Sequence, residues 1–85
     1  MENFDSIKSH DEVKVSILGP ENEKLYETSG SGFHSIGAAI EAAVSAANLQ
    51  IPPEDCVFVV SNLTSGVTHK YRFNAHGHLA QLPEL

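Results

Sequence analysis

Hydrophobic residues recur with a helical period in one stretch of the chain, residues 35–50, which is also rich in alanine. Apolar side chains return every three or four positions and polar ones fall opposite, which predicts a helix with one buried face. Ser35 is the expected N-cap, and Pro52 and Pro53 are expected to end the helix, because a proline pushes the residue before it toward extended geometry. The apolar stripe comprises Ile36, Ile40, Ala43, Val44, Ala47 and Ile51.

Two strands are predicted before this helix. Residues 13–18 alternate between apolar and polar side chains, which is the pattern of a half-buried strand. A glycine- and proline-containing loop follows, and residues 24–29 return as a second strand. The inward-facing residue of this second strand is either Leu25 or Tyr26, and the pattern does not decide between them.

Three more strands are predicted after the helix. Residues 56–60 are apolar on both faces, which is typical of a central strand, so we place this strand in the middle of the sheet. Residues 67–74 show the clearest alternation in the chain. A turn over residues 74–77, closed by Gly77 at positive φ, predicts a hairpin to a short strand at residues 78–82.

These elements predict an α+β fold: a single small domain in which an antiparallel sheet, in the order β-β-α-β-β-β, carries one helix packed on one face. Residues 1–11 are acidic and aperiodic, so we expect a flexible arm or one weak helical turn, which Phe4 and Ile7 could hold down, followed by the domain at residues 12–85. One helix covers only part of a five-stranded sheet. The apolar residues 57–60 therefore favour a curled sheet or a two-fold dimer, and self-association is our prediction.

Charge and length exclude several classes of function. Eighty-five residues with 41% hydrophobic content make a modest core without room for a buried substrate cavity and a lid. Acidic residues outnumber Lys and Arg by 11 to 5, so the chain lacks the basic cluster that nucleic acid requires. No apolar run approaches the roughly 18 residues of a membrane span, and the start does not resemble a signal peptide. We expect a cytoplasmic protein that binds neither nucleic acid nor membrane.

Few residues offer chemistry. Cys56 is the only cysteine, and we expect a buried, unreactive thiol. His69, His76 and His78 are weak candidates for a metal site, but no cysteine or carboxylate lies near them in sequence to complete it. The glycine-rich residues 30–37 lead into the helix but lack the Gly-Lys-Ser/Thr ending of a phosphate loop. We therefore assign no catalytic residue, metal or cofactor.

The strand ending in Ser-Gly-Ser-Gly, followed by an alanine-rich helix, resembles the last strand and helix of a double-stranded-RNA-binding domain. That family begins this helix with lysines that hold phosphates, whereas His34, Ser35 and Gly37 stand here. The resemblance therefore does not imply RNA binding. In size, acidity and build, the chain is similar to phage-encoded and mobile-element proteins, including inhibitors of bacterial defence such as anti-CRISPR proteins.

The expected function is a non-enzymatic protein-interaction module: a small acidic accessory or inhibitor protein of bacterial or phage type that binds a protein partner or itself. The candidate partner-binding residues are Lys70, Tyr71, Arg72 and Phe73, because aromatic and Arg side chains dominate interfaces. If the aromatic face of this strand lies under the helix, Lys70 and Arg72 are the exposed candidates. The alternative is a small-ligand or metal sensor that uses the C-terminal histidines or the glycine-rich turn.

Overall fold

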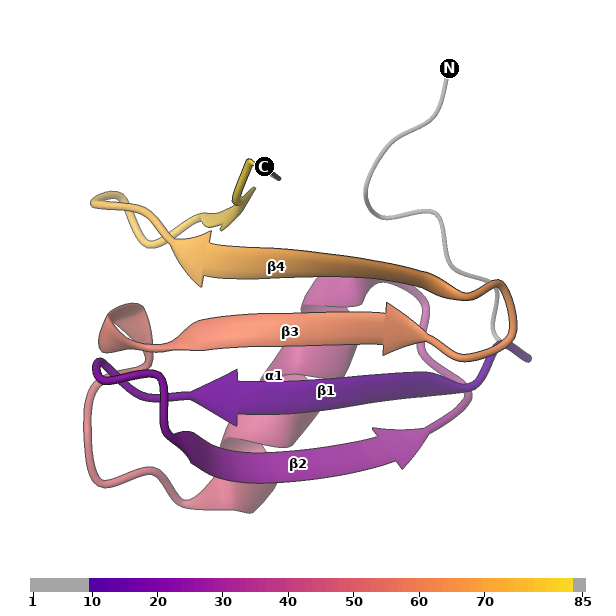
Figure 1. Cartoon of the computed structure of the whole chain (residues 1–85), viewed down its shortest axis with the longest axis horizontal. Coiled ribbons are helices and arrows are strands. Elements are labelled where there is room, and N and C mark those ends of the chain that lie inside the picture. The colour runs from indigo at the N-terminus through magenta and orange to yellow at the C-terminus, as the bar shows by residue number, and fades with distance from the viewer. Residues whose placement is uncertain (1–9, 84–85) are drawn as a thin grey trace.

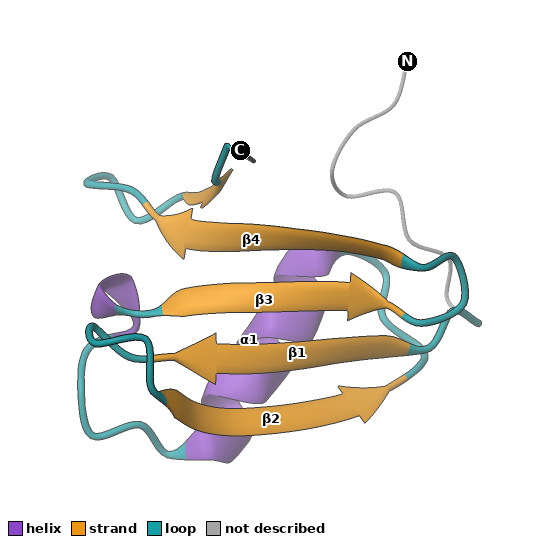
Figure 2. Cartoon of the chain, in the orientation of Figure 1, coloured by secondary structure: helices purple, strands orange, loops and turns teal. Residues whose placement is uncertain are grey.

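The computed structural model describes residues 10–83. Within this part of the chain, five strands form one antiparallel sheet in the order β2-β1-β3-β4-β5, and helix α1 crosses one face of it diagonally (Figure 1). The predicted fold class and element order are confirmed (Figure 2). The elements are β1 (Val13–Leu18), β2 (Lys24–Gly30), α1 (Ile36–Ala47), the 3-10 helix η1 (Pro53–Asp55), β3 (Val57–Asn62), β4 (Val67–Phe73) and β5 (Leu79–Gln81).

Helix α1 begins where the sequence predicts and ends earlier. Ser35 is extended, and its Oγ accepts a hydrogen bond of 3.1 Å from the backbone N–H of Ala38, so the predicted N-cap is confirmed. The prediction that the prolines end the helix is wrong. Asn48 adopts the left-handed conformation, with φ of 52°, and ends the helix before them. Ile51 therefore lies outside α1, although it still packs against the core.

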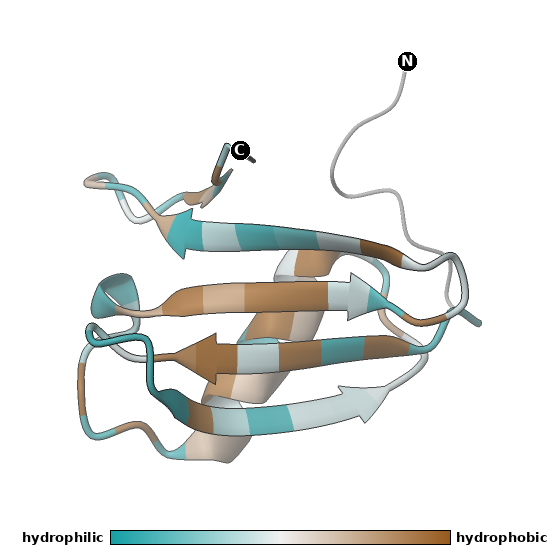
Figure 3. Cartoon of the chain, viewed as in Figure 1, coloured by the Kyte–Doolittle hydropathy of each residue, from teal (hydrophilic) through white to brown (hydrophobic). Residues whose placement is uncertain are grey.

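The core lies between α1 and the two strands β1 and β3. Hydrophobic residues are concentrated in these three elements, whereas β2 and β4 are more polar (Figure 3). Alternation along β1 sends Val13, Val15 and Ile17 to the helix side, where none is more than 1% exposed. The buried apolar residues are Val13, Val15, Ile17, Ile36, Ala39, Ile40, Ala43, Cys56, Phe58, Val60 and Tyr71.

Strand β3 occupies the centre of the sheet, as predicted. It starts one residue later than predicted, because Cys56 caps η1, and it extends to Asn62, which pairs with Val13 of β1. Val57 and Val59 are half-buried on the face away from α1. The apolarity of this strand on both faces is therefore real, but within residues 10–83 α1 covers only one of them.

One residue before the predicted domain boundary at residue 12 packs against the sheet. Asp11 is only 8% exposed, and its carboxylate accepts a hydrogen bond from Asn62 at the end of β3. Phe4 and Ile7, which could hold down the predicted arm, lie outside the described residues.

The turn between β4 and β5 has the predicted geometry. Gly77 has φ of 80°, and Asn74 Oδ1 accepts hydrogen bonds from the backbone N–H groups of His76 and His78 at 2.9 and 3.0 Å. The backbone N–H of Asn74 also donates to the carbonyl of His78 at 2.8 Å. Strand β4 ends at Phe73, and β5 is shorter than predicted.

Replacing Ser35 with alanine should destabilise the protein by about 1 kcal/mol, because an N–H in the first turn of α1 loses its acceptor. Thermal unfolding followed by circular dichroism measures the effect. Ser45→Ala is the matched control, since Ser45 is exposed on the same helix and caps nothing. Equal loss in both variants would contradict the role of the cap.

Candidate interaction surface

The sheet face opposite α1 is not covered by any other part of residues 10–83 (Figures 1 and 2). We call this the open face. Its side chains alternate with those of the core, and the strand register sorts them into rows that run across the sheet. The open face comprises Lys14, Ser16, Leu18, Lys24, Leu25, Glu27, Ser29, Val57, Val59, Ser61, Thr68, Lys70, Arg72 and Ala80.

One row, at the end of the sheet near the β1–β2 turn, is mainly apolar. Leu18 pairs with Val57 of β3 on one side and with Lys24 of β2 on the other. An irregularity in the β1–β2 register follows Ile17, and Leu25 is 38% exposed. Tyr26 pairs with Ile17 on the helix side, so it is the inward residue that the sequence left undecided.

The basic residues gather on the open face. Of the five Lys and Arg residues, Lys8 lies outside the described residues, and the other four are all in strands. Glu27 is the only acidic residue in the five strands. The other acids among residues 10–83 lie in α1, in η1 and in the connecting segments. A chain with a net charge of −6 therefore has one basic face.

Glu27 neutralises part of this charge. Its carboxylate contacts the ammonium of Lys24, lies 4.0 Å from Lys14 Nζ and accepts a hydrogen bond of 3.4 Å from Ser16 Oγ. The hydrogen bond from Lys24 lowers the pKa of the Glu27 carboxyl below its ordinary value and outweighs the opposite effect of burial. Lys14 and Lys24 are therefore paired. Lys70 and Arg72 are exposed and make no ion pair within residues 10–83.

The predicted partner-binding residues of β4 divide between the two faces. Tyr71 is fully buried, so the structure places it in the core, out of reach of a partner. Phe73 is half-buried on the same side, with its ring edge-on to that of Phe58 at 5.6 Å between centroids. Lys70 and Arg72 alternate with these aromatics and lie on the open face. The aromatic face of β4 thus lies on the helix side, and Lys70 and Arg72 are the exposed candidates.

The three candidate metal-binding histidines are not brought together. His69 Nδ1 lies 3.0 Å from Gln81 Nε2, and the His69 ring stands edge-on to Tyr71. His76 and His78 are exposed in the β4–β5 turn, with ring centroids 6.4 Å apart. Among the described residues, no group of three or more His, Cys, Asp or Glu side chains could hold a metal ion.

The single cysteine is buried, as expected, at the junction between η1 and β3. Its Sγ donates a hydrogen bond of 3.7 Å to the carbonyl of Pro52. Burial raises the pKa of the Cys56 thiol, and the carboxylate of Asp55 raises it further. The thiol is therefore protonated and packed, which is the opposite of what a nucleophile requires.

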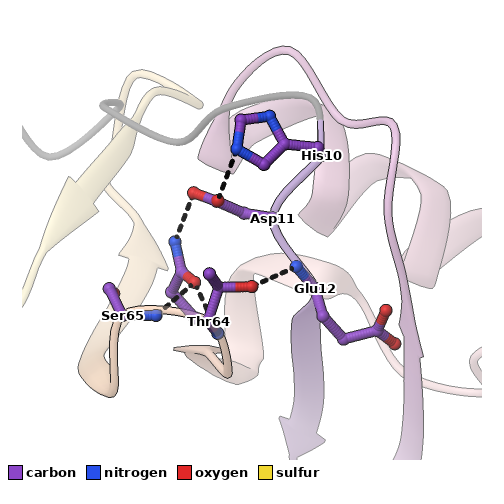
Figure 4. Close-up of polar contacts among 6 residues, drawn as sticks. His10, Asp11, Glu12, Thr64 and Ser65 are labelled. Carbon is purple, nitrogen blue, oxygen red and sulfur yellow. Dashed lines mark hydrogen bonds and ion pairs between the residues drawn. The ribbon is translucent and has the colours of Figure 1, made fainter.

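A second polar cluster, which sequence reasoning missed, joins the start of β1 to the β3–β4 turn (Figure 4). Asn62 Nδ2 donates to Asp11 at 2.9 Å, and Asn62 Oδ1 accepts from the N–H groups of Thr64 and Ser65 at 3.0 and 3.1 Å. The backbone N–H of Glu12 donates to Thr64 Oγ1 at 3.0 Å. An asparagine just before a turn that ends in glycine is the signal that could have revealed part of this cluster.

This cluster is structural rather than a ligand site. Asn62 is 8% exposed, and its side-chain oxygen and nitrogen are both used by the turn and by Asp11. Asn62-Leu63-Thr64 reads as a glycosylation sequon. In the folded protein, the amide that would carry the sugar is buried against a carboxylate.

Comparisons with known protein families, with curated proteins and with solved structures find no match. Within residues 10–83 there is no helix with the length and apolar character needed to cross a membrane. The candidate site therefore rests on the geometry of the open face.

Replacing Glu27 with glutamine should lower stability at neutral pH, because Lys14 and Lys24 lose their shared carboxylate. A lowered pKa in the folded state contributes stability above the ordinary pKa of a glutamate, about 4.3, and loses it as the pH falls through the lowered value. The difference in the free energy of unfolding between this variant and the wild type should thus vanish in acid. Urea unfolding across this pH range measures it, with Glu41→Gln on the exposed side of α1 as control. A difference independent of pH would contradict the pairing.

Replacing Asn62 with alanine should destabilise the fold by about 2 kcal/mol, because a buried carboxylate loses one hydrogen-bond donor and two turn N–H groups lose their acceptor. Asn74→Ala removes the same kind of turn bonds from an exposed position and should cost about 1 kcal/mol. Chemical denaturation of both variants isolates the contribution of the contact with Asp11. Equal losses would show that this contact adds nothing.

Proposed function

We propose that the protein is a non-enzymatic interaction module whose open face binds a protein partner. One observation carries the proposal: all four Lys and Arg residues within residues 10–83 share a face with solvent-facing valines, whereas the acids, apart from Glu27, lie elsewhere. An interface needs apolar area to bury and charge to set orientation. The open face offers both.

Two polar side chains are held by structural contacts, which supports a non-catalytic assignment. The thiol of Cys56 is packed in the core, and Asn62 is used by a turn. The small size and acidity of the chain, together with its build, support a cytoplasmic accessory or inhibitor protein of bacterial or phage type.

The outer side of α1 is a poorer surface for a partner. It presents Glu41, Ala42, Ser45 and Ala46, which are small or singly charged. Energetic hot spots in interfaces are enriched in Arg and large side chains and occur where contacts exclude water. Arg72, which lies next to the half-buried Val57 in the strand register, fits that description better than any residue on the exposed side of the helix.

Arg72→Glu should weaken capture of the partner about tenfold, because it reverses an unpaired charge at the proposed interface. Glu41→Lys changes charge equally in magnitude on the opposite side and should leave capture unchanged. The measurement is a pull-down from the native host with each tagged variant, quantified by mass spectrometry against the wild type. The reverse ranking would move the interface to α1 and contradict the proposal.

A further inference from the structure

We infer that the occupant of the open face is an acidic segment of a partner protein, with carboxylates that meet Lys70 and Arg72 and apolar side chains that cover Leu18 and Val57. This inference rests on the proposed function and adds the chemistry of the partner. The charge of the face and the charge of the rest of the chain favour the same kind of molecule.

The charge of the face is not balanced from within. Four cations and the single carboxylate of Glu27 leave a net charge of about +3 on the strands. Glu27 offsets one of the two charges of Lys14 and Lys24, so two of the three unbalanced charges lie on β4. Lys70 pairs across the strands with Val59, which places an unpaired cation beside half-buried apolar surface. Such surroundings strengthen a hydrogen-bonded carboxylate–cation contact once water is excluded.

The remaining surface restricts how an acidic partner can approach. The chain as a whole carries a charge of −6, and among residues 10–83 the acids other than Glu27 lie outside the strands. The open face therefore attracts a carboxylate-rich segment more than the rest of the described surface does. Complementary charge of this kind fixes orientation and raises the rate of association more than the affinity.

Apolar contacts beside these cations supply the area to be buried. Leu18 and Val57 pair across β1 and β3, and Leu25 is 38% exposed beside them. Phe58 pairs with Tyr71, so Val57 and Arg72 are the next residues along these antiparallel strands.

A second copy and a nucleic acid fit this surface less well. A two-fold copy stacked face to face would bring the same excess of cations together, which opposes the self-association expected from the valines alone. Nucleic acid would find phosphate ligands but no stacking platform, because the aromatic residues of the strands lie on the helix side. Those residues are Tyr26, Phe58, Tyr71 and Phe73.

The test uses a fluorescein-labelled peptide that repeats Glu-Leu-Glu-Ala four times, with matched peptides that carry Gln or Lys in place of Glu. Titration into isotopically labelled protein, read by amide chemical shifts, should move residues of β3 and β4 around Val57, Val59, Lys70 and Arg72. The Glu peptide should bind at least about fivefold more tightly than the Gln peptide, and the Lys peptide should not bind. Added salt should weaken binding of the Glu peptide.

Lys70→Gln/Arg72→Gln should weaken binding of the Glu peptide about fivefold to tenfold. Ser45→Glu/Gln50→Glu lowers the net charge equally at exposed positions in and after α1, and it should change binding by less than about twofold. Circular dichroism confirms that both variants fold. If the control weakens binding as much as the first variant, overall charge and not the open face is responsible, and the inference fails.

Three other results would overturn the inference: equal binding of the Glu and Gln peptides, tighter binding of a DNA duplex, or a dimer in sedimentation that Lys70→Gln/Arg72→Gln dissociates. The last would assign the face to a second copy. If a host protein depends on Arg72 while the Glu peptide fails to bind, the proposed function stands and only the acidic occupant is discarded. If no host protein depends on Arg72, the proposed function fails.

Discussion

The structure depends on one imbalance: α1, a helix of 12 residues, covers a single face of a five-stranded sheet whose central strand is apolar on both faces. On the covered face, Phe58 and Val60 are almost completely buried against β1 and α1. On the other face, Val57 and Val59 remain half-buried. A sheet in this state has to make its second face compatible with water or cover it with a partner.

The open face tolerates water because charged side chains surround its apolar centre. Ser16 is 8% exposed although it faces away from α1, since Lys14 and Glu27 lie next to it and Glu27 accepts its hydroxyl hydrogen. Cations along the strands also oppose edge-to-edge or face-to-face stacking of sheets. The residues that make this face compatible with water are therefore the same ones that give it its positive charge.

Sequence periodicity predicted what depends on neighbours in the chain: the extent of β1, the Ser35 cap, the Gly77 turn and the burial of Cys56. It failed where the backbone conformation of one residue ends an element, as at Asn48, whose left-handed conformation ends α1. It also failed where contacts join distant segments, because Asp11 and Asn62 are 51 positions apart. Alternation along each strand shows which side chains share a face of that strand, but the strand order is needed to show which faces lie together. The sequence therefore identified Lys70 and Arg72 as candidates but did not predict that they share a face with Lys14 and Lys24.

Strand β3 separates contacts that stabilise the fold from the proposed interaction surface along its length. Its last residue, Asn62, ties the β3–β4 turn to the start of β1, whereas its first residue, Val57, lies in the apolar row next to Arg72. Five residue steps of extended chain put these ends about 17 Å apart. Substitutions more than about 10 Å apart that share no partners act independently. The contacts that hold the fold at one end of the sheet can therefore stay fixed while the face at the other end adapts to what it binds.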